Sequence, residues 1–122
     1  MNEARRQALE AGGVDVDQAL ERMMGSEALL ERLLGKFLED ESFPALRAAL
    51  AAGDGAGAAA AAHALKGVCG NLSMTALFSL FTAQVDALRR GDLAEADRLM
   101  ADIAPAMAAV TAAIRGERHG AD

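Results

Sequence analysis

LAEADRLMADIAPAMAAVTAAI (residues 93–114) is the most regular stretch of the sequence. Its apolar residues recur at steps of three and four without a miss: Leu93, Ala96, Met100, Ile103, Met107, Val110 and Ile114. This spacing is typical of a helix that buries one face. Asp92 and Glu95 resemble a capping box with aspartate in the serine or threonine position, and Pro105 is expected to bend the helix. The stretch therefore predicts a long amphipathic helix.

The same kinds of signal divide the rest of the chain into helices. Alanine and leucine dominate and β-branched residues are few, so helix propensity is high and strand propensity is low. Caps and breakers predict further helices over residues 17–24, 26–52, 54–71 and 73–90. Pro44 should kink or interrupt the second of these. We expect an all-α fold, an antiparallel four-helix bundle with a short additional N-terminal helix over residues 1–116, followed by a polar tail over residues 117–122.

Charge and composition argue against several classes of function. Twelve lysines and arginines against eighteen aspartates and glutamates leave a net charge of −6, which disfavours binding to nucleic acid and to acidic membranes. The first residues, MNEARRQALE, lack the apolar region of a signal peptide, and no stretch approaches the roughly 18 apolar residues of a membrane span. We therefore expect a cytoplasmic protein. The single cysteine excludes an internal disulfide.

The segment AAHALKGVCGNLSM (residues 61–74) places one histidine in an alanine-rich helix. At about 100° per residue, His63 points roughly 140–180° away from the apolar stripe of that helix. The stripe consists of Ala61, Leu65, Val68 and Leu72. The helical neighbours of the ring are all small: Ala59, Ala60, Gly67 and Gly70. The histidine is therefore expected to face solvent on a bare surface.

Two glycines and a lysine accompany this histidine. A glycine inside a helix costs about 1 kcal/mol relative to alanine, so Gly67 and Gly70 indicate either that another protein approaches closely here or that helices pack closely. Lys66, one turn after His63, lies on the same face as the ring, where its positive charge would hold an anion delivered to the ring. An exposed imidazole, a neighbouring cation and a bare surface suit a nucleophile that accepts a phosphoryl group from a bulky protein donor.

The sequence resembles the histidine phosphotransfer (HPt) family on these residues. The motif of that family reads approximately H-x-L-K-G-x-x-x-N-[IL]-G, and His63-Ala64-Leu65-Lys66-Gly67 and Asn71-Leu72 match it. The resemblance extends to VDVDQALERMMG (residues 14–25), ALLERLLGKFLED (residues 28–40) and both Gly-Asp turns. It thus covers nearly the whole chain.

This resemblance implies a phosphorelay function and a role for each site residue. His63 would be phosphorylated, Lys66 would lie beside the phosphate, and Gly67, supported by Gly70, would give clearance to the partner. The phosphoryl group would come from an aspartate of one receiver domain and pass to another receiver, on response regulators or on a hybrid histidine kinase. Mg²⁺ would belong to the receiver. We expect a monomer without cofactor or metal and not an enzyme, since no ATP-binding signature such as GxxxxGK[ST] is found.

Two regions depart from the family pattern. Ser73-Met74 stands where the family usually has glycine and then alanine, so the turn before the helix over residues 73–90 is expected to be built differently. Val85 stands where family members often carry Gln or Glu near the histidine, and Gln84 occupies a usually apolar position.

The helix over residues 73–90 carries a second apolar stripe beside its core stripe. The members of this second stripe step by four, three and four: Met74, Phe78, Phe81 and Val85. A helix with two adjacent apolar stripes buries more than one neighbouring helix can cover. We expect Met74 and Phe78 to be mostly buried. Val85 and part of Phe81 are expected to be exposed beside His63.

The exposed part of this stripe is expected to form a docking surface for the receiver. Met23 or Met24 would complete an apolar rim with Phe81 and Val85. Arg89, which continues the stripe, would supply a second cation for phosphate.

Other readings of these residues are open. His63 is alternatively an ordinary surface histidine, in which case the chain is a helical protein-interaction domain without phosphotransfer. An enzyme that uses His63 as a general base is a weaker alternative, because no acidic residue lies within a helical turn of it. A haem or metal bundle is weaker still, since the histidine faces away from the core and Glu-x-x-His pairs are absent from the sequence. Cys69 is expected to be a small core residue.

Overall fold

The computed structural model describes residues 1–117, which form seven helices and no strand. The helices are α1 (Glu3–Gly12), α2 (Val16–Arg22), α3 (Glu27–Glu39), α4 (Ser42–Ala51), α5 (Gly55–Asn71), α6 (Thr75–Arg89) and α7 (Leu93–Arg115). The predicted all-α class is confirmed. The polar tail predicted over residues 117–122 falls, except for Glu117, outside the described residues.

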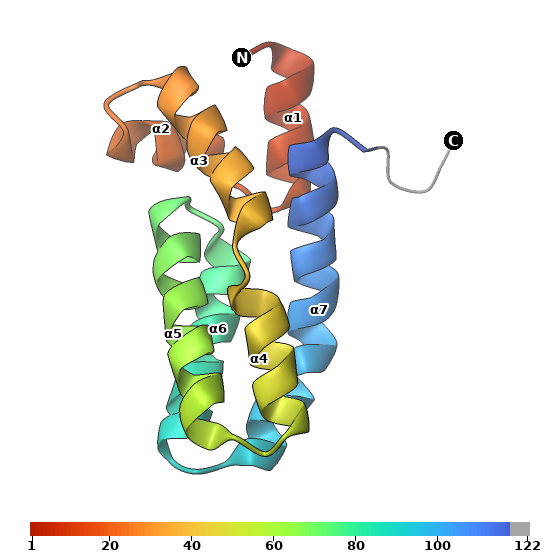
Figure 1. Ribbon diagram of the computed structural model, residues 1–122. Coiled ribbons are helices and arrows are strands. Elements are labelled where there is room, and N and C mark those ends of the chain that lie inside the picture. The colour runs from red at the N-terminus through yellow and green to blue at the C-terminus, as the bar shows by residue number, and fades with distance from the viewer. Residues whose placement is uncertain (118–122) are drawn as a thin grey trace.

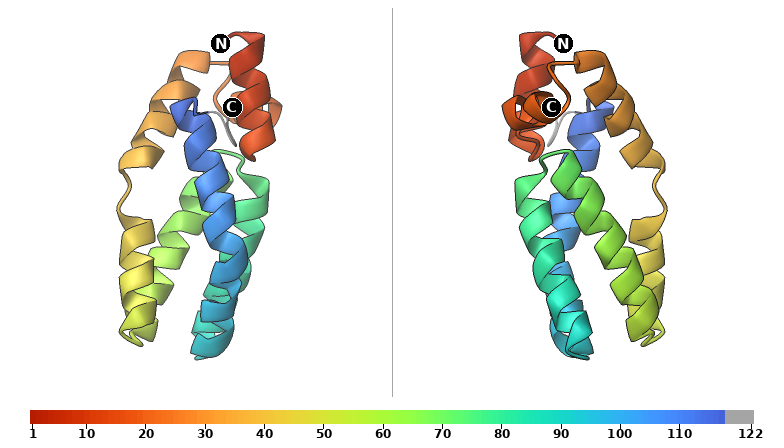
Figure 2. Two further views of the ribbon diagram at one scale, coloured as in Figure 1. Left: turned by 90° about the vertical axis from the view of Figure 1, so that its right-hand side faces the viewer. Right: turned by 90° about the vertical axis from the view of Figure 1, so that its left-hand side faces the viewer.

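The last four helices, α4, α5, α6 and α7, run alternately up and down (Figure 1). α5 packs against α4 on one side and α6 on the other, and α6 packs against α7. The second view of Figure 2 shows α5 and α6 side by side on one face of the molecule. α1 lies along the C-terminal half of α7, and α2 and α3 occupy the same end of the molecule (Figure 1).

Helix α1 was not predicted from the sequence. It begins at the N-cap Asn2, whose side-chain oxygen accepts a hydrogen bond from the backbone N–H of Arg5, and it buries only one apolar residue, Leu9. Its last residue, Gly12, lies so close to α7 that a Cβ there would come within 2.4 Å of the Cβ of Ala113. With a single buried apolar residue, α1 has no apolar stripe from which its presence could be predicted. Close backbone approach and polar contacts hold it in place instead.

The side chain of Arg5 joins α1 to two other helices. Its guanidinium donates hydrogen bonds to both carboxylate oxygens of Glu31 on α3, at 2.8 and 3.0 Å. It also donates to the carbonyl oxygens of Ala113 and Ile114 at 2.9 Å each. These two carbonyls belong to the last turn of α7, which has no following turn to supply N–H donors; that of Ala113 also accepts a hydrogen bond from the backbone N–H of Gly116 at 3.1 Å. Arg5 thus caps α7 and anchors α1.

The predicted helix over residues 26–52 is divided into α3 and α4, with the break at Asp40 and Glu41. Pro44 explains the position of the break, because proline has no N–H to donate to the carbonyl four residues earlier and its ring crowds that carbonyl. That residue is Asp40, whose carboxylate instead accepts a hydrogen bond from the backbone N–H of Ser42 at 2.7 Å. The interruption predicted at Pro44 is therefore confirmed, four residues before the proline.

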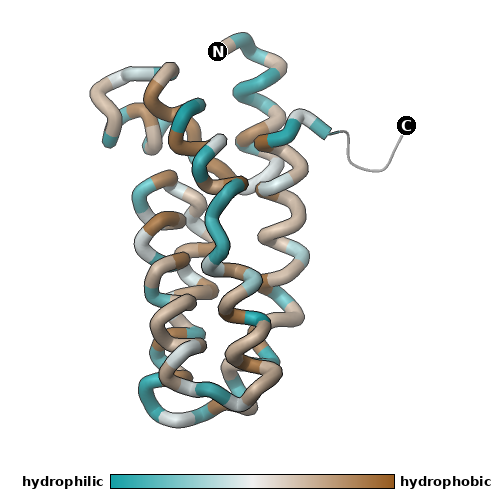
Figure 3. The backbone as a smooth tube through the Cα atoms, in the orientation of Figure 1, coloured by the Kyte–Doolittle hydropathy of each residue, from teal (hydrophilic) through white to brown (hydrophobic). Residues whose placement is uncertain are grey.

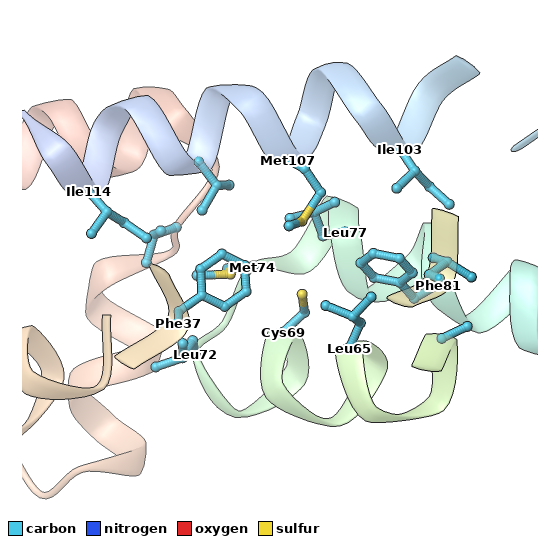
Figure 4. Packing of buried hydrophobic residues seen from close by; sticks show 14 of the residues in the cluster. Phe37, Leu65, Cys69, Leu72, Met74, Leu77, Phe81, Ile103, Met107 and Ile114 are labelled. Carbon is cyan, nitrogen blue, oxygen red and sulfur yellow. The ribbon is translucent and has the colours of Figure 1, made fainter. Parts of the chain in front are cut away.

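Every helix contributes to the core, and the labelled side chains of Figure 4 come from α3, α5, α6, α7 and the turn between α5 and α6. The predicted stripe of α7 is buried at Ile103, Met107, Val110 and Ile114. Cys69 is fully buried, as predicted, and burial, with a smaller contribution from the charge of Asp40, raises the pKa of its thiol to about 12. The thiol therefore stays protonated and acts as a small core residue.

Gln84 and Ser73 are the two buried polar residues among those described. The side chain of Gln84 is fully buried, and its amide nitrogen donates a hydrogen bond to the carbonyl oxygen of Ala96 at 3.0 Å. The bond joins α6 to α7 at a position that is apolar in the family pattern.

Hydrophilic residues mark two of the connections between helices (Figure 3), the break between α3 and α4 and the turn between α6 and α7. In the part of the chain that the structure describes, no helix combines the length and the apolar character needed to cross a membrane.

Candidate functional site

His63 lies on the exposed face of α5. Its neighbours in sequence toward the core, Ala62 and Leu65, are buried, so the helix is fixed against the bundle while the ring points outward. Helix α5 itself is started by Asp54, whose carboxylate accepts a hydrogen bond from the backbone N–H of Gly57 at 2.9 Å. The predicted exposure of the histidine is confirmed.

Gly67 keeps the surface next to the histidine open. Apart from its chain neighbours and the nearby backbone of α5, a Cβ placed on this residue would meet no atom of residues 1–117 within 4 Å. Gly67 also lines two hollows on opposite sides of α5, one shared with Phe37 of α3 and one shared with Arg22 of α2. The glycine is therefore not needed for packing within the chain, which agrees with its predicted role as clearance for a partner.

Gly70 serves a different purpose. A Cβ at this position would lie 3.0 Å from two carbons of the Phe78 ring on α6, closer than ordinary van der Waals contact. Of the two readings left open for this glycine, the structure favours close packing between helices. The absent side chain lets the aromatic ring rest against the backbone of α5.

Lys66, which directly precedes Gly67, is half-buried. Its Nζ atom lies 5.9 Å from the centroid of the Phe78 ring, within the range of a cation–π interaction. The ring was not predicted as a partner of Lys66. Gly70, four residues after the lysine, was the only sign of this contact in the sequence. A side chain at that position would occupy the place of the Phe78 ring.

The turn between α5 and α6 is built around Ser73, where the family usually has glycine. Ser73 has a φ of +54°, and the backbone N–H of Met74 donates to the carbonyl of Cys69 at 2.9 Å, the hydrogen bond of a Schellman cap. Ser73 is buried, and its hydroxyl accepts a hydrogen bond from Nε of Arg22 at 3.2 Å. Its carbonyl accepts another from the backbone N–H of Asp15 at 2.9 Å. The serine thus ties this turn to α2.

Several predictions for the second stripe of α6 are wrong. Met74 is buried as expected, but Phe78 is 39 % exposed, whereas Phe81 and Val85 are buried, the latter at 2 % exposure. The stripe is covered because α6 has two neighbours, α5 and α7, and so buries both of its apolar faces. Figure 4 shows Phe81 in the core between α5 and α7. Phe81 and Val85 therefore cannot form a docking surface.

The two methionines after α2 have opposite environments. Met23 is buried, so it is not available to a partner. Met24 is 97 % exposed and has a φ of +54° in the turn that ends α2. Of the four residues predicted to line the docking surface, only Met24 is exposed.

The contact between Gly70 and Phe78 also indicates how α5 and α6 line up. The helices run in opposite directions (Figure 1), so the residue seven before Gly70 lies about level with the residue seven after Phe78. His63 is therefore about level with Val85, and Arg89 lies about one turn beyond. Arg89, the last residue of α6, is exposed. Its role as a second cation stays a prediction.

The described residues offer no alternative metal chemistry at this face. Within residues 1–117, no group of three or more His, Cys, Asp or Glu side chains lies together in a way that could hold a metal ion. The site consists of an exposed imidazole, an adjacent ammonium and an open helix surface.

Comparison with known proteins gives one match. A family model described as the Hpt domain matches residues 3–116, nearly the whole chain. Neither a curated protein nor a solved structure matches in the corresponding comparisons. Hpt domains are helical bundles that mediate histidine phosphotransfer in phosphorelays and interact there with receiver domains. Since the match extends from α1 to the end of α7, the chain belongs to the Hpt domain family.

Proposed function

We propose that this chain is a phosphocarrier in which His63 accepts a phosphoryl group from the aspartate of one receiver domain and passes it to another. The observation that carries the proposal is the exposure of His63 on a face of α5 where Gly67 leaves the surface open. The match to residues 3–116 supports it, because Hpt domains are phosphocarriers and not kinases.

The transfer needs only groups that these two proteins supply. A ring nitrogen of His63 uses its lone pair to form an N–P bond while the P–O bond to the receiver's aspartate breaks. The aspartate keeps the bonding electrons as a carboxylate, and the other ring nitrogen keeps its proton. Lys66 stabilises the negative charge of the phosphoryl oxygens by a charge-assisted hydrogen bond. Mg²⁺ belongs to the receiver, and the reverse sequence at a second receiver completes the relay.

The exposed position of His63 also bears on the partner. A histidine without a pocket of its own depends on the docked receiver to exclude water from the reacting atoms. We propose receivers of response regulators and of a hybrid histidine kinase as these partners, and a monomeric, cytoplasmic phosphocarrier.

The test of the proposal is transfer of ³²P from a panel of phosphorylated receiver domains to the purified chain. The wild type should acquire label that is labile in acid and stable in alkali, as expected for phosphohistidine. His63→Gln should keep the fold, because the side chain is exposed, and should acquire none. Label of this kind on the His63→Gln variant would show that another residue is the acceptor. A wild-type chain that takes no label from any receiver would favour an interaction domain without phosphotransfer.

Lys66→Ala tests the role of the cation. Alanine is the best helix former, so the helix should persist. Loss of a charge-assisted contact worth about 1.5–3 kcal/mol should slow the transfer roughly 10- to 150-fold if the contact is fully expressed in the transition state. An unchanged single-turnover rate would mean that Lys66 is only a surface lysine.

A further inference from the structure

Lys66 and Phe78 form a contact to which the phosphotransfer reaction itself assigns no role. The lysine Nζ atom lies 5.9 Å from the ring centroid. Phe78 is 39 % exposed, although the other members of its apolar stripe are buried. The ring rests on Gly70, where a Cβ would come within 3.0 Å of two of its carbons. The ring is thus held at the surface by α5, beside the cation that follows the histidine.

Helix geometry indicates that Lys66 cannot contact the ring and a phosphoryl group on His63 at the same time. Gly70, which marks the level of the ring, is seven residues after His63, about 10.5 Å along the helix axis. A charge-assisted hydrogen bond needs about 2.7–2.9 Å between nitrogen and oxygen, and Nζ lies 5.9 Å from the ring centroid. The hydrogen-bond length and the distance from Nζ to the ring centroid, taken together, are shorter than the axial distance between His63 and Gly70. The histidine side chain increases the separation, since side chains on a helix lean toward its N-terminus.

Lys66 must therefore exchange one contact for the other when His63 is phosphorylated. A charge-assisted hydrogen bond to a phosphoryl oxygen is stronger than a cation–π contact at an exposed site. The ammonium consequently leaves the ring for the phosphate. The contact with Phe78 then stabilises only the unphosphorylated chain.

We propose that Phe78 is a positioning residue that holds Lys66 in the unphosphorylated chain and so shifts the phosphoryl exchange away from phosphohistidine. The proposal rests on His63 being the phosphoacceptor. An interaction made before the transfer and lost after it displaces the equilibrium toward the state that has it. Phe78 thus makes the phosphoryl group on His63 easier to pass to the next receiver.

The test is the equilibrium distribution of ³²P between this chain and one receiver domain that donates to the wild type. The receiver is phosphorylated with acetyl phosphate, freed of the reagent, and mixed with wild type, Phe78→Leu, Lys66→Met or the double variant. Phe78→Leu should shift the equilibrium about 2- to 5-fold toward phosphohistidine, as expected for loss of an exposed cation–π contact. In the Lys66→Met background, the same substitution should produce no shift.

This readout separates positioning from docking. A residue that only contacts the receiver in the complex changes the forward and reverse rates together and leaves the equilibrium between the free proteins unchanged. Phe78→Trp keeps an aromatic face and should not move toward phosphohistidine. Phe43→Leu is the matched control, because the ring of Phe43 lies under Arg47 at 4.7 Å on α4, away from His63, and its loss should leave the equilibrium unchanged.

Gly70→Ala gives a second route to the same result. The added Cβ must push the Phe78 ring away while the ring itself is kept, so the equilibrium should move in the same direction as for Phe78→Leu, and by less. An unmoved equilibrium in Phe78→Leu, a shift in the opposite direction, or an equal shift without Lys66 would overturn the proposal. A wild type that takes no label overturns the proposed function as well, whereas a labelled wild type with an unmoved Phe78→Leu equilibrium overturns only the role of Phe78.

Discussion

Ser73 allows the backbone conformation of the α5–α6 turn to be separated from its side-chain contact. The residue has a φ of +54°, in the left-handed region that glycine adopts freely. Its hydroxyl accepts a hydrogen bond from Arg22, and neither alanine nor glycine can replace that bond. Ser73→Ala and Ser73→Gly therefore lose the same contact. Only Ser73→Gly relieves the backbone.

The expected free energies of unfolding follow from these two effects. The left-handed conformation costs a residue with a Cβ roughly 1–2 kcal/mol, and glycine loses about 0.5–1 kcal/mol more conformational freedom on folding. Ser73→Gly should therefore be more stable than Ser73→Ala by about 1 kcal/mol. The lost hydrogen bond is expected to lower the stability of Ser73→Ala by about 0.5–1.5 kcal/mol relative to wild type, which leaves Ser73→Gly close to wild type.

Equilibrium urea unfolding followed by far-ultraviolet circular dichroism measures these differences, since the chain has neither Trp nor Tyr for fluorescence. Gly91→Ala is a matched control. Gly91 has a φ of +74° in the same kind of turn after α6, and a Cβ there would meet no atom of residues 1–117 within 4 Å apart from its chain neighbours. Its substitution should lower the stability by the same amount, about 1 kcal/mol. If Ser73→Ala and Ser73→Gly unfold at the same urea concentration while Gly91→Ala is destabilised, Ser73 does not hold the left-handed conformation.

Two further predictions concern the packing of the bundle. Arg5→Met should lower the free energy of unfolding by about 1–3 kcal/mol at neutral pH and by less in acid. The hydrogen bonds from Arg5 lower the pKa of Glu31, so their contribution is present above the ordinary glutamate pKa of about 4.3 and is lost as the pH falls below it. An equal loss at pH 3 and pH 7 in urea titrations would contradict this. Val85→Glu should lower the stability by about 3–5 kcal/mol, because it places an uncompensated charge in the core. Ala83→Glu, at an exposed position of the same helix, should change the melting temperature little. Similar melting temperatures for the two variants would mean that Val85 is not in the core.

Most of the helices could be predicted from local signals in the sequence. The steps of three and four in α7, the capping residues Asp54 and Asp92, and the effect of Pro44 all act within a few residues, so their consequences are visible without the fold. Helix α1 has capping residues, Asn2 and Gly13, but it buries only Leu9 and so lacks an apolar stripe. It depends on the contacts of Arg5 and Gly12 with other helices, which only the folded chain brings together.

The candidate site was predictable only where it depends on one helix. The exposure of His63 follows from its angle relative to Leu65 on the same helix, and both are as expected. The environment of α6 depends on which helices lie on either side of it, and the sequence does not specify this. The prediction assumed that one neighbouring helix covers the apolar surface of α6, so Val85 was wrongly predicted to be exposed. The pairing of Lys66 with Phe78 depends in the same way on the alignment of α5 with α6.

The small side chains of α5 also bear on how specificity can arise. The buried face of this helix includes Leu65 and Cys69, which hold it against the bundle, while its outer face offers Ala60, Ala64 and Gly67 around the histidine. Such a surface has few groups with which to distinguish one partner from another. If the proposed receivers dock on this surface, large side chains beside it would discriminate between them, and Phe78, 39 % exposed against Gly70 of α5, is such a side chain. If Phe78 also holds Lys66, a change at this one position alters both partner choice and the direction of phosphoryl exchange, so the two properties are coupled at the edge of α5.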